Sequence, residues 1–305
     1  MQERNVNRIA IIGAGDMGSG VAAELLENGF DVATCLKGRS QRSRKLAERA
    51  GIRNVGDYET LAADADMLLS IVPPTAAIAV AREIVPFIRD SASKALYVEC
   101  NAVAPSTVRK IAETAANHEV DFQDAGIVGA PPRAGRPAVR VYTSGPHEDG
   151  LRRITTERID VKPLGTEIGR ASAMKMVYAS LTKGTNALRA AAILTARQLG
   201  VSEELGKELA HSLPEVHEAM RNRMPNIACD AARWTGEMRE IAATYEAVGL
   251  TSRFHEGAEW IYELLSHSTI ADESRDEANS RKRNLEEVTE IYHRTLLDQL
   301  GEHLP

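Results

Sequence analysis

Three things that the sequence has little of exclude several classes of protein. Aromatic residues make up 4% of the 305 residues and the formal net charge is -6, so the chain lacks the stacking surface and the positive charge that nucleic-acid binding requires. No apolar run reaches membrane-spanning length. The polar start, Met1 to Arg8, lacks the apolar core of a signal peptide. We therefore expect a cytoplasmic protein without nucleic-acid or membrane partners.

Cysteine is scarce as well. Cys35, Cys100 and Cys229 are odd in number and widely spaced, which argues against a disulfide framework and against a zinc site. We interpret all three as thiols of the core and expect no bound metal. With 43% apolar residues, a chain of this length is long enough for two domains and a sizeable core.

The first thirty residues carry the strongest pattern. An apolar run, Arg8 to Ile12, has the length of a strand, a glycine-rich turn comes next, and an Ala/Leu-rich stretch at helical spacing extends to Gly29. In such a turn the first glycine allows the tight bend, the second lets the backbone approach a pyrophosphate, and the third lets the helix pack on the strand. A turn that merely packs tightly is the alternative. We predict a dinucleotide site formed by Gly13, Ala14, Gly15, Asp16, Met17 and Gly18.

The segment after the second expected strand, Phe30 to Leu36, indicates which dinucleotide. An NAD site usually has an acidic residue about twenty positions beyond the glycine turn, and here stand Cys35 and Leu36 instead. A basic run extends from Lys37 to Lys45, with Ser40 as a predicted N-cap. Cations at a helix start are favourable when an anion lies among them. We therefore predict NADP, with NAD still possible, bound by Lys37, Arg39 and Ser40; a solvated basic turn is the alternative.

Further apolar runs alternate with helical segments through the first half of the chain: 67–72, 95–100, 120–124 and 139–144. This pattern predicts an α/β fold with a doubly wound parallel sheet. Ligands bind at the carboxyl ends of such strands. Candidate cofactor residues are therefore Val72, Pro73, Pro74 and Asn101, and candidate substrate residues are Gly126, Val128 and Gly129. The prolines could simply end a strand, and Asn101 could cap the turn before Pro105.

A glycine- and proline-rich loop is expected from Ala125 to Pro137. Its two arginines, Arg133 and Arg136, could hold an anionic substrate or could lie in solvent. After Gly165 the composition becomes helix-forming almost to the end of the chain. We therefore predict an NAD(P)-binding domain of Rossmann type at residues 1–165 and an all-α domain at residues 166–305.

One long helix is expected from Gly169 to about Leu199. At 100° per residue Lys175, Thr182 and Asn186 share a stripe of it. A base beside a nicotinamide would take the hydroxyl proton of a substrate, and Lys175 fits this role, with Tyr178 about a turn away. A free lysine titrates near pH ~10.4, so burial and a cationic nicotinamide would have to lower its pKa. A surface charge is the alternative. Thr182 and Asn186 are candidate substrate residues.

The second half offers two weaker candidates. Arg233, Glu237 and Glu240 share a helical face beside Trp234, and either close a polar pocket or pair with one another in solvent, the interpretation we favour. His255, after a loop, binds substrate or is structural.

Taken together, Gly13 to Gly18, Val72-Pro73, and Gly169 with Lys175 six positions beyond it resemble the β-hydroxyacid dehydrogenases, the superfamily of 6-phosphogluconate and 3-hydroxyisobutyrate dehydrogenases. The resemblance implies an NAD(P)-dependent dehydrogenase with Lys175 as general acid/base, a helical C-terminal domain and a homodimer.

The chain also departs from that family. The usual substrate loop, Asp-Ala-Pro-Val-Ser-Gly-Gly, is here Asp124-Ala-Gly-Ile-Val-Gly-Ala130, and the asparagine one turn beyond the lysine is Ala179. We therefore expect a less characterised branch, acting on a small hydroxy or keto compound. The alternatives are an imine or enamine reductase with Tyr178 as proton donor, and a non-catalytic protein that senses NADPH.

Overall fold

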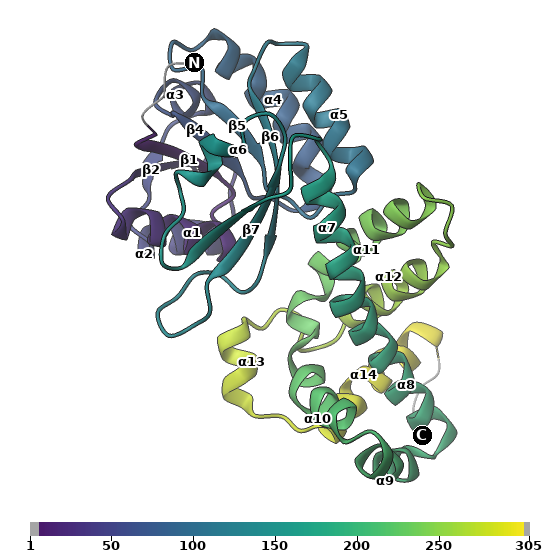
Figure 1. The fold of residues 1–305 in the computed structure, drawn as a ribbon. Coiled ribbons are helices and arrows are strands. Elements are labelled where there is room, and N and C mark those ends of the chain that lie inside the picture. The colour runs from purple at the N-terminus through teal and green to yellow at the C-terminus, as the bar shows by residue number, and fades with distance from the viewer. Residues whose placement is uncertain (1–5, 302–305) are drawn as a thin grey trace. The chain divides into compact units, whose positions relative to one another are not determined.

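The computed structural model describes residues 6–301, so the polar start at residues 1–5 lies outside the described residues. They form two compact units, one ending at Met176 and the other beginning at Val177 (Figure 1). We call them the N-terminal unit and the helical unit. Their boundary falls inside a helix, eleven residues beyond the domain boundary expected at Gly165. The domain assignment itself stays a prediction.

An eight-stranded sheet forms the centre of the N-terminal unit. Its strands lie in the order β3-β2-β1-β4-β5-β6-β7-β8. All neighbours are parallel except β6 and β7, which are antiparallel. The strands are β1 Arg8–Ile12, β2 Asp31–Cys35, β3 Arg53–Val55, β4 Met67–Ser70, β5 Leu96–Glu99, β6 Phe122–Val128, β7 Val139–Ser144 and β8 Ile159–Pro163.

Helices cover both faces of this sheet, because its central strands are apolar on both sides. One core lies between the sheet and α3, α4 and α5, and includes Leu61, Ile84 and Ile111. The other lies under α1, α2 and α6, and includes Val21 and Leu25. The helices are α1 Asp16–Glu27, α2 Gln41–Arg49, α3 Tyr58–Ala63, η1 Pro74–Ala76, α4 Ala77–Asp90, α5 Pro105–Ala116, α6 Glu148–Arg152 and α7 Arg170–Ala179.

The predicted fold class is confirmed, with three corrections of detail. The sheet is mostly and not wholly parallel, because β6 and β7 are joined by a loop too short to cross over. The short strands β3 and β8 were not predicted. Strand β6 continues to Val128, because Gly126, Ile127 and Val128 pair with β7, so the expected loop begins only at Gly129.

The helical unit contains no strand among its described residues. It consists of η2 Ser180–Gly184, α8 Thr185–Leu199, α9 Ser202–Ser212, α10 Pro214–Arg223, η3 Met224–Asn226, α11 Ala228–Glu246, α12 Arg253–Ser266, α13 Arg275–Arg281 and α14 Leu285–Leu300. Tyr262 and Tyr292 are fully buried in it. Within the part of the chain that the structure describes, no helix is long and apolar enough to cross a membrane.

Two of the three cysteines lie where the sequence placed them. Cys35 and Cys100 are buried free thiols, and burial raises the pKa of Cys100 well above its usual value. The prediction is wrong for Cys229, which is only partly buried. It stands in the first turn of α11, a helix with an exposed side.

Candidate active site

The glycine turn lies between β1 and α1. Gly13 has φ +98°, and a Cβ there would lie 2.1 Å from the carbonyl oxygen of Ile71. A Cβ on Gly18 would lie 2.0 Å from the carbonyl oxygen of Gly13, so α1 packs on the turn as closely as predicted. At Gly15 a Cβ would meet no atom within 4 Å. The space beside Gly15 and the amides at the start of α1 therefore fit a pyrophosphate group.

The strand register shows which residues share the carboxyl edge of the sheet. Ile12 pairs with Ser70, Ser70 with Glu99, and Glu99 with Asp124, so these four residues form one row across β1, β4, β5 and β6. The strand order reverses between β1 and β4, which is where doubly wound sheets bind dinucleotides. The candidate residues just beyond these strands therefore lie along one edge.

The basic side chains after β2 differ in the partners that they bind. Arg42 pairs with Asp16 at 2.7 Å, and Arg44 donates to the carbonyl oxygens of Leu36 and Arg39. Ser40 is the N-cap of α2 as predicted, because its hydroxyl accepts from the amide of Ser43. Arg42 is paired with a carboxylate and Arg44 is bound to two backbone carbonyl oxygens, whereas Arg39 donates to a neutral hydroxyl. Lys37 and Arg39 are therefore the better candidates for holding a 2′-phosphate.

Arg39 is oriented by a neighbouring helix. Its guanidinium donates to the hydroxyl of Tyr58, the first residue of α3, at 2.7 Å. Tyr58 is half-buried, and burial is the main reason why its pKa is raised. A guanidinium held at one nitrogen keeps further donors for an anion.

The residues after β4 and β5 are joined by one buried side chain. Asn101 is 2% exposed; its Oδ1 accepts from the amide of Val72 at 2.6 Å, and its Nδ2 donates to Ser70 Oγ at 3.1 Å. Pro73 is exposed and Pro74 is buried. The contacts of Asn101 favour a structural role, different from the turn cap considered from the sequence, and its contact with a cofactor stays a prediction.

A carboxyl group that sequence reasoning missed lies beside them. Glu99 is fully buried at the end of β5, where the amide of Asn101 and the hydroxyl of Tyr97 donate to it. Burial raises its pKa to about 8. The missed signal is an acidic residue inside an apolar strand, which is rare without a partner.

Lys175 is half-buried on α7, with its amine donating to the carbonyl oxygen of Ile127 near the end of β6. Gly126 makes this possible. A Cβ at Gly126 would lie 2.8 Å from the carbonyl oxygen of Ala171 and 2.9 Å from Cβ of Lys175. The absence of a side chain at Gly126 therefore lets α7 pack closely on β6. Its predicted role in contacting substrate stays untested, and the side chain of Val128 is buried in the core.

Asp124 fixes the start of α7. Its carboxyl accepts from the Ser172 hydroxyl at 2.7 Å, from the amides of Gly169 at 2.9 Å and Ser172 at 3.2 Å, and from the Ser144 hydroxyl at 2.9 Å. Ser144, opposite Asp124 on β7, accepts from the amide of Ala171. The group is fully buried, and burial raises its pKa while these donors oppose the shift. Nothing in the sequence pattern had assigned a role to Asp124.

The loop after β6 lies against α1. A Cβ on Gly20 would come within 2.8 Å of Cβ of Pro131. Gly129 has φ +130°, which only glycine adopts readily. Arg133 and Arg136 are exposed, so of the two interpretations the structure favours solvent.

The helix after α7 does not keep a regular period. Residues 180–184 form a π-helical segment, so the stripe of Lys175, Thr182 and Asn186 expected at 100° per residue is wrong beyond Ala179. Tyr178 is 40% exposed, the Thr182 hydroxyl donates to the carbonyl oxygen of Tyr178, and Asn186 accepts from Arg189. Their roles stay predictions.

The π segment is held by partners on α11 and α12. Lys183 pairs with Glu237, which also accepts from Arg233 at 2.6 Å. Tyr262 donates to the carbonyl oxygen of Lys183, and Ser180 shares a hydrogen bond of 2.8 Å with Tyr245. Solvent pairing was therefore the wrong prediction for Glu237, which is 2% exposed. Lys183 is the partner that sequence reasoning did not assign, because it lies 54 residues away.

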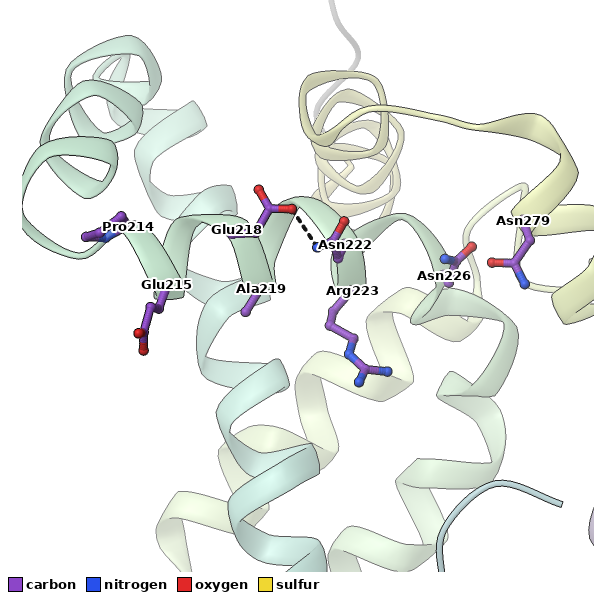
Figure 2. Close-up of a pocket in the computed structure, with 8 residues that line it drawn as sticks. All are labelled: Pro214, Glu215, Glu218, Ala219, Asn222, Arg223, Asn226 and Asn279. Atoms are coloured by element: carbon purple, nitrogen blue, oxygen red, sulfur yellow. Dashed lines mark hydrogen bonds between the residues drawn. The ribbon is translucent and has the colours of Figure 1, made fainter. Parts of the chain in front are cut away.

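Two further features belong to the helical unit. His255 is 6% exposed against the ring of Tyr245, and burial lowers its pKa. These surroundings favour the structural interpretation over substrate binding. A pocket of about 860 Å³ is lined mainly by residues of α10 and contains none of the candidate residues. Figure 2 shows its lining side chains, among them Glu218 and Arg223. Among residues 6–301, no group of three His, Cys, Asp or Glu could hold a metal ion.

Comparison with known proteins agrees with this geometry. Residues 8–154 match the NAD binding domain of 6-phosphogluconate dehydrogenase. This match covers most of the N-terminal unit, which therefore contains a domain similar to that NAD-binding domain. Residues 196–265 match a domain of unknown function, DUF1932. The resemblance stated from the sequence is thereby confirmed.

Two proteins of similar sequence are uncharacterised. An uncharacterised 28.5 kDa protein of Methanothermus fervidus is 29% identical over 65% of this chain and 74% of its own length. An uncharacterised oxidoreductase of Synechocystis is 25% identical over 73% of this chain and 78% of its own.

Solved structures share the fold. The conserved protein MTH1747, described as structurally similar to 3-hydroxyacid dehydrogenases, matches 90% of this chain and 99% of its own with a TM-score of 0.61 and 25% identity. A 3-hydroxyisobutyrate dehydrogenase of Salmonella typhimurium matches 90% and 99% with a TM-score of 0.67 at 16% identity, which shows the fold alone. The N-terminal unit thus carries a domain similar to the NAD binding domain of 6-phosphogluconate dehydrogenase, and one of the proteins that the chain resembles is named an oxidoreductase. The homodimer implied by the resemblance stays a prediction.

Proposed function

We propose that the protein is an NADP-preferring oxidoreductase that transfers hydride between the nicotinamide and a small hydroxy or keto compound, with Lys175 as general acid/base. The observation that carries this proposal is the hydrogen bond from the Lys175 amine to the carbonyl oxygen of Ile127. Ile127 is the last residue but one of β6, so the amine lies at the carboxyl edge of the sheet, the edge that carries the glycine turn.

The strand order supports our proposal that this amine lies near the nicotinamide half of the bound cofactor. The pyrophosphate site lies between β1 and β4. Lys37 and Arg39, after β2, lie on one side of it and suit the adenosine half. The residues after β4 and β5, on the other side, would then hold the nicotinamide half. Three strand spacings separate β1 from β6, about 14 Å at ~4.8 Å each, a distance that half of an extended dinucleotide can approach.

The surroundings of Lys175 suit proton transfer. When bound, the nicotinamide supplies or accepts the hydride. The carbonyl of Ile127 accepts one hydrogen of the amine and holds the nitrogen at the end of β6, where we propose that a substrate oxygen approaches it. Lys175 would then take the hydroxyl proton during oxidation and return it during reduction. Lys183 suits this role less well, because its amine is already paired with the buried Glu237 side chain.

The residues just beyond β2 support a preference for NADP. Leu36, Lys37 and Arg39 stand where an NAD site usually has a carboxylate that bonds the ribose 2′-hydroxyl. Arg39 is already oriented by Tyr58, so little side-chain entropy is lost when it binds a 2′-phosphate.

A panel of matched substrates tests the proposal. Small hydroxy acids, their keto acids and the corresponding cyclic imines are offered with NADPH or NADP, and absorbance of the reduced nicotinamide is followed. We expect turnover with hydroxy or keto compounds. Turnover with imines alone would favour a reductase with Tyr178 as proton donor. Tight NADPH binding without turnover of any compound would favour a sensing protein.

A further inference from the structure

The contact between β6 and α7 has more interactions than the packing of one helix on one strand requires. Within four residues β6 touches α7 in three different ways: Asp124 binds its first turn, Gly126 leaves room for its backbone, and Ile127 accepts from the Lys175 amine. All of these residues lie in the N-terminal unit.

The first of these contacts fixes where α7 begins. The first amides of a helix have no acceptor within the helix, and here Asp124 and Ser144 supply acceptors for the amides of Gly169, Ala171 and Ser172. A carboxylate at this end also interacts favourably with the helix dipole. Because the Ser172 hydroxyl binds the same carboxyl, α7 is restrained in rotation as well as in position along its axis.

The second contact fixes the distance between α7 and β6. Ala171 and Lys175 are four residues apart and lie on one face of the helix, and both approach Gly126. Ordinary contacts of a Cβ begin near 3.4 Å, so the 2.8 Å and 2.9 Å approaches leave no space for one. With its start and its distance both fixed, α7 places the Lys175 side chain against the end of β6.

We propose that Asp124, together with Ser172, Ser144 and Gly126, is a positioning group that sets the location of the Lys175 amine for proton transfer. The inference rests on the proposed function of Lys175. It assigns an acidic residue and a glycine of β6 a role that acts through Lys175. A misplacement of about 1 Å can lower a rate ~100-fold, so even a small shift of α7 has a measurable effect.

The test uses the full-length protein and the substrate found active in the panel. The variants are Asp124→Asn, Ser172→Ala and Gly126→Ala. Asp66→Asn is the matched control, because Asp66 also accepts backbone amides, those of Asn7 and Arg8, but lies before β4 at the opposite edge of the sheet. Lys175→Met is measured beside them. Turnover is expressed per NADPH-binding site, determined by titration, so that unfolded protein does not count.

We expect the three variants to bind NADPH as the unchanged protein does, with KM altered less than about threefold and kcat lowered about 10- to 100-fold. Lys175→Met should abolish one limb of the pH profile of kcat, and in each of the three variants this limb should move to another pH. Asp66→Asn should change neither kcat nor the position of this limb. If kcat per binding site and the pH limb are unchanged in the variants that fold, the contact is only structural and the inference is wrong. If Lys175→Met keeps full turnover, the proposed function fails and the inference fails with it.

Discussion

Replacing Arg39 by alanine should separate NADPH from NADH binding. The Arg39 guanidinium lies after β2, where the Tyr58 hydroxyl accepts from it at 2.7 Å and leaves its other donors for an anion. A hydrogen bond to a charged group contributes about 1.5–3 kcal/mol. Since ~1.4 kcal/mol corresponds to a tenfold change in affinity, Arg39→Ala should weaken NADPH binding roughly 10- to 100-fold. NADH, which has no 2′-phosphate, should bind as before.

Tyr58→Phe refines this prediction. It leaves the charge of Arg39 in place and removes only the group that orients it, so we expect a smaller loss, on the order of two- to tenfold, for NADPH alone. Arg49→Ala is the control, because Arg49 is an exposed cation in the last turn of α2, the helix that begins just after Arg39. Dissociation constants are measured by quenching of protein fluorescence or by calorimetry. If the unchanged protein binds both nucleotides equally, or if Arg39→Ala weakens both to the same extent, the reasoning is refuted.

Three further predictions concern the turn, the helical unit and a buried carboxyl. Without nucleotide, Gly15→Ala should have the melting temperature of the unchanged protein, because its Cβ meets no atom within 4 Å, but it should bind nucleotide more weakly. Gly18→Ala should lower the melting temperature itself, since its Cβ would lie 2.0 Å from a carbonyl oxygen. Glu237→Ala should lower the free energy of unfolding by about 3–5 kcal/mol, because Lys183 and Arg233 lose their buried carboxylate, whereas Glu259→Ala, which breaks a more exposed pair, should cost about 1 kcal/mol or less. Urea unfolding followed by tryptophan fluorescence measures this in the helical unit, which contains both tryptophans; equal losses in the two variants would be contrary to the argument.

The third of these predictions concerns Glu99. Because burial raises its pKa from 4.5 to about 8, the folded protein keeps a proton that the unfolded chain releases. Its contribution to the free energy of unfolding is therefore fully present below pH 4.5 and falls as the pH rises to about 8. Urea unfolding at several pH values should show a shallower decline for Glu99→Gln than for the unchanged protein, and identical declines would rule the effect out.

The sequence was informative where structure is local. The glycine turn, the Ser40 cap and the apolar strands each depend on neighbouring residues, so the pattern of residue types was enough to place them. The resemblance to a known family then singled out Lys175 among many helix lysines. Composition and spacing alone did not do so.

The features that the sequence did not predict depend on residues that are distant along the chain. Asp124 meets Gly169 and Ser172 only after 45 and 48 residues, and Lys183 meets Glu237 after 54. No period reveals such pairs. The π segment was missed for a related reason: its hydrogen-bond pattern is fixed by Tyr245, Tyr262 and Glu237, which lie on other helices.

The most direct test of the central claim is the turnover of Lys175→Met under saturating NADPH and substrate. We predict that this variant binds NADPH within about twofold of the unchanged protein while kcat falls ~100- to 10,000-fold, the usual contribution of a positioned acid/base group. Lys110→Met, which removes an exposed lysine of α5, should keep full activity. Unaltered kcat in Lys175→Met would contradict the account.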